Sequence, residues 1–204
     1  MPLVNLNGNG HEGRVWLTPD ELTLSISSER NGPQDIQIVI RPDIGQGFGS
    51  PDRNHLMKVN GVGTERDDPF LTADGLRLYL SSTSGPAGRF QLLVATRGST
   101  TTDFGSPAVV PGFKNDMRNL VDPTLYQDER LLIFSILQTS GNDDLWYATR
   151  ASAADDFGQP VQIPTINTSG SEVDPILSDD GCELYFSSTQ RDGKHHIFHA
   201  QVTK

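Results

Sequence analysis

The apolar residues of this chain fall into short runs, most of which alternate with polar residues. The pattern is clearest in DIQIVIR (35–41), QLLVATR (91–97), DLWYATR (144–150) and HIFHAQV (196–202). Period-2 alternation bounded by turn residues predicts β-strands, and no segment has the 3.6-residue period of an amphipathic helix. The 20 Gly and 13 Pro residues supply turns between the runs. The sequence therefore predicts an all-β protein.

One strand-turn-strand pattern occurs four times along the chain. The copies read RVWLTPDELTLSISS from Arg14, DPFLTADGLRLYLSS from Asp68, DPTLYQDERLLIFSI from Asp122 and DPILSDDGCELYFSS from Asp174. Each copy has an acid in its turn, and these acids are Asp20, Asp74, Asp128 and Asp180, spaced by 54, 54 and 52 residues. Four-stranded units that repeat at this period are typical of β-propeller blades, since a single four-stranded sheet cannot bury both of its faces.

Each copy continues with a turn and a third strand, and the first three then have a loop ending in FGSP or FGQP and a fourth short strand. We therefore predict one β-propeller domain with four blades of four antiparallel strands. Residues 2–7, PLVNLN, are predicted to supply the outer strand of the last blade, where the printed sequence stops after the third strand. The approximate blades are 11–61, 66–115, 120–167 and 172–204 plus 2–7. A linear β array and two chains sharing one larger ring are the alternatives.

The repeated residues resemble the WD-repeat-like β-propeller repeat of TolB-type proteins. The Asp-Pro…Asp-Gly pattern recurs, with some departures, through all four copies, which together cover nearly the whole chain. The first copy departs from it at Arg14-Val15 and Glu21, and the third has Glu129 where Gly is expected. The resemblance implies the fold and leaves the function open, because such propellers include binding scaffolds, assembly partners and hydrolase accessory domains. It slightly favours a periplasmic or extracellular location, although no signal peptide is visible.

The net charge of −10 and the pI of about 4.8 disfavour binding to nucleic acid or anionic membranes. No apolar run approaches the roughly 18 residues of a membrane span, so no membrane insertion is predicted. The expected partners are a protein, a small ligand or small ions, and the chain is expected to be a monomer or a homodimer.

The repeated acids Asp68, Asp122 and Asp174 are candidate catalytic carboxylates. Catalysis requires different residues in different roles, whereas the same acid in several equivalent blades favours a structural role in turns. The leading interpretation is therefore a non-enzymatic binding module with no catalytic residues. One alternative is a glycan- or peptide-directed hydrolase that uses carboxylates at the mouth of the propeller's central channel. Another is a fragment of a larger surface or periplasmic protein.

A ligand site is better sought where the repeats differ, at the central channel and its mouth. Trp16, for example, stands where the other copies have Phe, Thr and Ile. The candidate ligand-binding residues are Arg14, Trp16, Phe70, Thr124, Tyr126, Ile176, Glu12, Glu65, Arg66 and Glu172.

The channel itself predicts an ion site, because each innermost strand turns unpaired backbone groups toward the axis. We expect a chloride, sodium or calcium ion there. The histidines do not predict a transition-metal site: in one strand, His195 and His199 would lie about 13 Å apart, too far to share a zinc ion.

Overall fold

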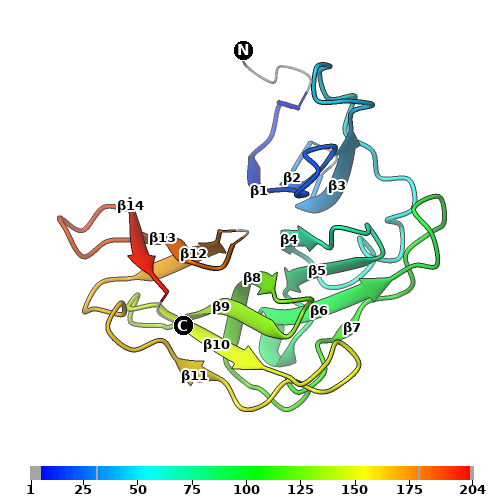
Figure 1. Ribbon diagram of the computed structural model, residues 1–204. Coiled ribbons are helices and arrows are strands. Elements are labelled where there is room, and N and C mark those ends of the chain that lie inside the picture. The colour runs from blue at the N-terminus through cyan, green and yellow to red at the C-terminus, as the bar shows by residue number, and fades with distance from the viewer. Residues whose placement is uncertain (1–5, 31, 179, 203–204) are drawn as a thin grey trace.

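The computed structural model describes residues 6–30, 32–178 and 180–202, and it confirms the all-β prediction. The described residues form fourteen strands and one short 3-10 turn at Pro86–Gly88 (Figure 1). No helix in this part of the chain is long and apolar enough to cross a membrane.

The strands form four antiparallel sheets, which we call blades one to four. Blade one contains β1 (Glu12–Leu17), β2 (Thr23–Ser28) and β3 (Asp35–Ile40). Blade two contains β4 (Arg66–Leu71), β5 (Arg77–Ser82), β6 (Gln91–Thr96) and β7 (Ala108–Val109). Blade three contains β8 (Asn119–Tyr126), β9 (Leu131–Leu137), β10 (Asp144–Thr149) and β11 (Val161–Gln162). Blade four contains β12 (Glu172–Leu177), β13 (Glu183–Ser188) and β14 (His196–Gln201).

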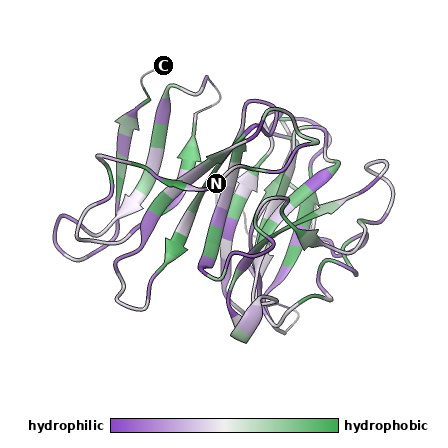
Figure 2. Cartoon of the chain, turned by 90° about the horizontal axis from the view of Figure 1, so that it is seen from below, coloured by the Kyte–Doolittle hydropathy of each residue, from purple (hydrophilic) through white to green (hydrophobic). Residues whose placement is uncertain are grey.

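The blades stand side by side around a common axis, with β1, β4, β8 and β12 innermost (Figure 1). Hydrophobic and hydrophilic positions alternate along the strands (Figure 2), so each blade offers apolar side chains to its neighbours on both faces. Blades one and two meet through Ile36 and Leu71, blades two and three through Phe70 and Phe134. Buried apolar contact of this kind is the main force that holds neighbouring sheets together.

Each innermost strand contains a bulge at the same place in the repeat. The pairing register shifts there in all four blades, and the bulged residues are Arg14, Asp68, Asp122 and Asp174, with φ of 47°, 53°, 56° and 56°. A bulged residue leaves the strand ladder and its side chain is re-aimed. The repeat therefore places one side chain from each blade at a common level of the axis.

The FG-x-P motif fastens the outer part of three blades. An arginine that follows the third strand lies over the Phe ring of the motif, in the pairs Arg41–Phe48, Arg97–Phe104 and Arg150–Phe157, at 4.8, 4.4 and 4.2 Å from the ring centroid. The motif is thus explained by cation–π packing within the blade.

Two features differ from the prediction. Four strands per blade are present only in blades two and three, since the outer strand of blade one is reduced to a single bridge between Ile38 and Asp52, and β14 has no outer partner strand among the described residues. Of the predicted N-terminal strand, residues 2–5 lie outside the described residues, and Leu6 packs against Leu24 and Val39 of blade one, not against β14.

The strands of blade four and blade one lie apart (Figure 1), and we call this break in the ring of strands the slot. Within the described ranges, no strand of blade one comes within 8 Å of a strand of blade four, measured between Cα atoms, whereas every other pair of consecutive blades is in contact. The backbone ring is therefore open on one side.

Candidate functional site

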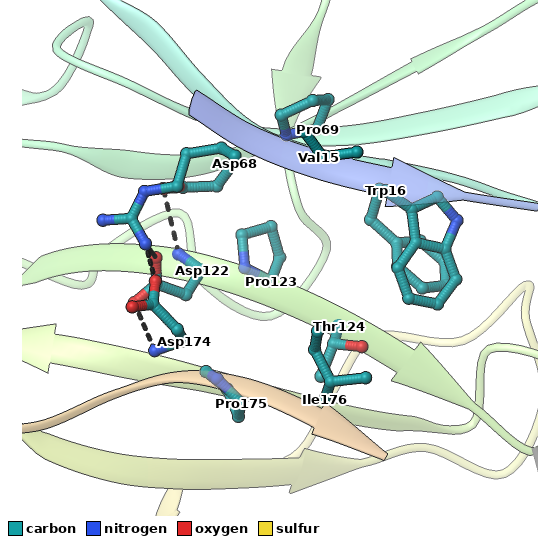
Figure 3. A pocket seen from close by; sticks show the side chains of 12 residues that line it. Val15, Trp16, Asp68, Pro69, Asp122, Pro123, Thr124, Asp174, Pro175 and Ile176 are labelled. Carbon is teal, nitrogen blue, oxygen red and sulfur yellow. Dashed lines mark hydrogen bonds and ion pairs between the residues drawn. The ribbon is translucent and has the colours of Figure 1, made fainter. Parts of the chain in front are cut away.

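A cavity of about 330 Å³ lies on the axis and is lined by three equivalent positions from each innermost strand (Figure 3). The first level is Arg14, Asp68, Asp122 and Asp174, the second is Val15, Pro69, Pro123 and Pro175, and the third is Trp16, Phe70, Thr124 and Ile176. The acids gather at one end of the cavity, and Trp16 and Ile176 lie at the other (Figure 3). The repeat therefore builds a site that is ionic at one end and largely apolar at the other.

The acids at the ionic end link each blade to the next. Asp68 Oδ2 accepts the backbone N–H of Asp122 at 3.1 Å, and Asp122 Oδ2 accepts that of Asp174 at 3.2 Å. Ser81 also donates to Asp68 Oδ2. These carboxylates were expected to hold local turns. They instead bond across the blade boundaries, because the bulge turns them out of their own strand.

The acids of the outer hairpin turns do act locally, as predicted. Thr18 donates to Asp20 and Thr72 donates to Asp74, each at 2.6 Å, and the same carboxylates accept the N–H groups of Leu22 and Leu76. The threonine hydrogen bond is the main cause that lowers the pKa of both Asp20 and Asp74. Hydrogen bonds to a charged form favour that form.

Arg14 occupies the fourth place in the ring of bulged residues. Its guanidinium lies 3.1 Å from Asp68 Oδ1 and 3.3 Å from Asp122 Oδ1, and it also pairs with the Asp174 carboxylate. One cation therefore serves three acids from three blades, which it can do because a guanidinium presents five N–H donors in a planar fork.

The three acids are equivalent in sequence and unlike in environment. Burial raises the pKa of Asp68 well above its usual range, and the charges of Asp122 and Asp67 raise it further. Burial also raises the pKa of Asp122, although Arg14 opposes that shift. The side chain of Asp174 is 41% exposed, against 6% for Asp68, because it borders the slot. The site thus contains buried carboxyls that tend to keep a proton and one accessible carboxylate.

The apolar end of the cavity has an aromatic wall. The rings of Trp16 and Phe70 lie 4.3 Å apart between centroids, and the indole N–H of Trp16 donates to Leu71 O at 3.0 Å. That hydrogen bond fixes the indole, so Trp16 offers a rigid apolar surface to a ligand.

A second cavity, of about 870 Å³, shares Trp16 and Phe70 with the first and extends between the hairpin turns of blades one to three. Tyr126, another predicted ligand residue, lines this cavity together with Glu129. The Glu129 carboxylate accepts the Tyr79 hydroxyl and pairs with Arg77 at 2.7 Å. The pKa of Tyr79 is raised to about 12, mainly because the hydroxyl is buried and next because it is hydrogen-bonded to Glu129. Glu129 was not among the predicted site residues, although its place in the Gly position of the repeat was a usable signal.

The remaining predicted residues line neither cavity. Glu12 and Glu172 accept backbone N–H groups of their preceding loops, from Gly8 and Thr168 at 2.7 Å each. Arg66 is buried in an ion pair with Asp35. It is Arg66, not Glu65, that matches Glu12, because the two pair with Ser82 and Ser28 at the same register. The contacts of these residues hold loops in place, and a role for them in ligand binding stays a prediction.

Among the described residues, no cluster of three or more His, Cys, Asp or Glu is arranged to hold a metal ion. The channel ion stays a prediction.

The fold resembles that of solved β-propeller proteins. A structure of TolB from Agrobacterium tumefaciens is 17% identical, with a TM-score of 0.61 over 97% of this chain and 60% of the other. An endo-arabinase from Bacteroides thetaiotaomicron is also 17% identical, with a TM-score of 0.61 over 91% of this chain and 72% of that one. An α-L-arabinofuranosidase from Podospora anserina is 12% identical, with a TM-score of 0.58 over 91% and 69%. No family model and no curated protein matches the sequence.

These neighbours correct the functional expectation. We expected a non-enzymatic module, but the neighbours include several glycoside hydrolases and two peptidases alongside TolB, so they favour the hydrolase alternative. The chain spans less than two thirds of the TolB chain, and identities of this size establish the fold alone. The chain therefore has a TolB-like β-propeller fold.

Proposed function

We propose that the protein is a glycan-directed hydrolase with its active site in the axial cavity. The observation that carries the proposal is the pairing of unlike carboxyls in one cavity, with buried Asp68 favouring its protonated form and exposed Asp174 ion-paired to Arg14. Glycoside hydrolysis needs two such groups, one that donates a proton and one that acts as a base or nucleophile.

Asp68 is suited to be the general acid. Its raised pKa keeps a proton available at a pH where an ordinary carboxyl has lost it. In the proposed reaction this proton passes to the glycosidic oxygen as the bond from that oxygen to the anomeric carbon breaks.

Asp174 is suited to the second role. Its side chain is partly exposed in the cavity, and its carboxylate is ion-paired with Arg14. The carboxylate either takes the proton of the attacking water or attacks the anomeric carbon itself, and in the second case water later releases the sugar. Arg14 would hold the carboxylate in place for both routes.

The cavity also suits a sugar. A volume of about 330 Å³ lies at the lower end of the range for small-ligand sites. The apolar face of a sugar ring can stack on the Trp16–Phe70 wall, while its hydroxyls face the acids. Since two of the neighbouring structures are an endo-arabinase and an arabinofuranosidase, arabinose-containing glycans are the first substrates to test.

The test is an assay for release of nitrophenol from aryl arabinofuranosides and of reducing ends from arabinan. Asp174→Asn and Asp68→Asn are expected to lower kcat at least about a hundredfold, the usual contribution of a positioned acid or base. Asp156→Asn, which changes an exposed acid outside both cavities, is the charge-matched control and is expected to keep full activity.

The two variants should also differ in their pH profiles, because Asp68 is assigned the acid role and Asp174 the base role. Loss of Asp68 should remove the alkaline limb of the profile, and loss of Asp174 the acidic limb. Activity on peptides but not on glycans, or full activity in Asp174→Asn, would overturn the proposal.

A further inference from the structure

The two faces that border the slot are built like the faces that the other blades bury. Leu17 on β1 is 38% exposed, whereas its equivalent in blade two, Leu71, is 1% exposed. Ile197 on β14 is 84% exposed, whereas the residues that pair at the same register in the other blades are fully buried, namely Ile36, Leu92 and Leu145. A side chain of this kind at a position buried in every other blade indicates a missing partner.

In two other blades, the residue equivalent to Ile197 has an asparagine side chain as its partner. In blade one, Asn60 accepts the backbone N–H of Ile36 and donates to its carbonyl, both at 2.9 Å. In blade three, Asn167 makes the same two bonds with Leu145, again at 2.9 Å. In both cases the asparagine comes from the loop that leads into the next blade, and it caps the outer edge of the preceding third strand.

Asn7 occupies the corresponding position before blade one. The N–H one residue after the asparagine bonds to the strand's Glu at 2.7 Å in both places, Gly8 to Glu12 and Thr168 to Glu172. The segment 7–12 therefore sits on blade one as 167–172 sits on blade four. Leu6 covers Leu24 and Ile26, much as Ile166 joins the cluster that contains Leu184 and Phe186.

In the ring that the described residues form, blade four stands on the other side of the slot from blade one, so the residue that Asn7 should cap is Ile197. We propose that the slot closes within one chain, with the Asn7 side chain bonding the N–H and C=O of Ile197 and Leu6 covering the Ile197 side chain. The surface formed by Ile197 and the outer edge of β14 is thus the docking site for the segment around Leu6 and Asn7. This inference is independent of the proposed activity.

The ring of bulged residues favours closure within one chain over closure by a second copy. Arg14 of blade one already pairs with Asp174 of blade four in the same molecule, while it also contacts Asp68 and Asp122. A larger ring shared by two chains would place the Asp174 of another molecule beside Arg14, and the three acids of one chain could not meet one guanidinium.

The first test follows the exchange of backbone amides in residues 196–201 by hydrogen–deuterium exchange on the full chain. In the closed ring the Ile197 amide is expected to exchange slowly, and Asn7→Ala is expected to speed its exchange about fivefold to tenfold, the effect of losing one hydrogen bond. Asn9→Ala, an exposed asparagine two residues away, is the matched control and should change nothing. Asn167→Ala should have the same effect on the Leu145 amide, which calibrates the measurement.

The second test distinguishes closure in one chain from exchange between two. Asn7→Cys is combined with Ile197→Cys in a Cys182→Ser background, so that no other thiol is present. Mild oxidation should give a disulfide within a monomer, seen as a shifted band on a non-reducing gel. A disulfide-linked dimer, or an Ile197 amide that exchanges equally fast with and without Asn7, would overturn the proposal.

Discussion

The Arg14 guanidinium nitrogen Nη1 lies 3.3 Å from Asp122 Oδ1, although the two residues belong to blades one and three, which are not neighbours in the ring. The guanidinium reaches this carboxylate across the axis, since the bulges place both residues at one level of the channel. The ring of bulged residues is therefore a single electrostatic unit, and a change of charge at one residue should alter the electrostatic energy of the others.

Replacement of Arg14 by alanine should destabilise the fold, because the buried Asp68 and Asp122 carboxyls would lose the N–H donors and the positive charge that the guanidinium brings to them. We expect a loss of about 2–3 kcal/mol in the free energy of unfolding, less than for a fully buried pair because Arg14 is partly exposed. Urea denaturation measures this, with Arg191→Ala at an exposed turn as the control. The double variant Arg14→Ala, Asp68→Asn should recover part of the loss, and simple additivity of the two effects would contradict the shared network.

Asp68 should make the protein less stable as the pH rises. Its folded-state pKa lies above its unfolded value near 4, so the folded state binds the proton more tightly. Its contribution to stability is thus fully present below the unfolded pKa and is lost as the pH rises through the raised one. The free energy of unfolding of wild type minus that of Asp68→Asn should therefore fall as the pH rises above about 4. A difference that increases above that pH would show that the carboxyl ionises readily.

Trp16 should report ligand binding. The chain has two tryptophans, and Trp146 stands apart from the axial cavity beneath the Arg118 guanidinium. In a Trp146→Phe variant, addition of an arabino-oligosaccharide should shift or quench the remaining fluorescence. The reciprocal variant, Trp16→Phe, should show no change on titration, and a signal that came only from Trp146 would place the ligand elsewhere.

Glycine should have opposite effects at the two equivalent turn positions that carry glutamate. Glu21 and Glu129 have φ of 60° and 64°, a conformation that costs a non-glycine residue about 1–2 kcal/mol. Glu21 pairs with Arg41 at the surface, so Glu21→Gly should leave stability unchanged or raise it slightly.

Glu129→Gly should instead destabilise. The buried Tyr79 hydroxyl loses its acceptor, at a cost of about 1–3 kcal/mol, and Arg77 loses its ion-pair partner, and together these losses outweigh the relieved strain. It should also lower the pKa of Tyr79 from about 12, which ultraviolet titration of the phenolate measures. An unchanged Tyr79 pKa would mean that Glu129 does not contact it in solution.

The repeat allowed much of the fold to be predicted, because strand alternation and turn residues depend on local sequence. The same equivalence identified Arg14 and Trp16 as the exceptional members of their levels, and both line the cavity. The direction of the Asp68 side chain could not be predicted, because a bulge with positive φ leaves no mark in the pattern of apolar and polar residues. A one-residue offset before β4 likewise made Glu65 appear to be the equivalent of Glu12, where the structure has Arg66.

The chemistry of the site was harder to predict for a related reason. Three acids at equivalent positions indicated a structural role, and two of them do link neighbouring blades. Their difference in burial arises from the slot beside Asp174, which is a property of the whole ring and not of any one repeat. Equivalent residues can thus acquire different proton affinities without any change in their local sequence.

The level formed by Arg14 and the three acids prevents the four repeats from being identical in sequence. If all four copies were identical, four carboxyls would converge on one axis with no cation among them. A gene that arose by duplication of one blade would therefore have had to lose its symmetry at this level before the four bulged residues could pack closely together. A consensus design that averages the four repeats would place aspartate at position 14 and should fold less stably than the natural, imperfect sequence.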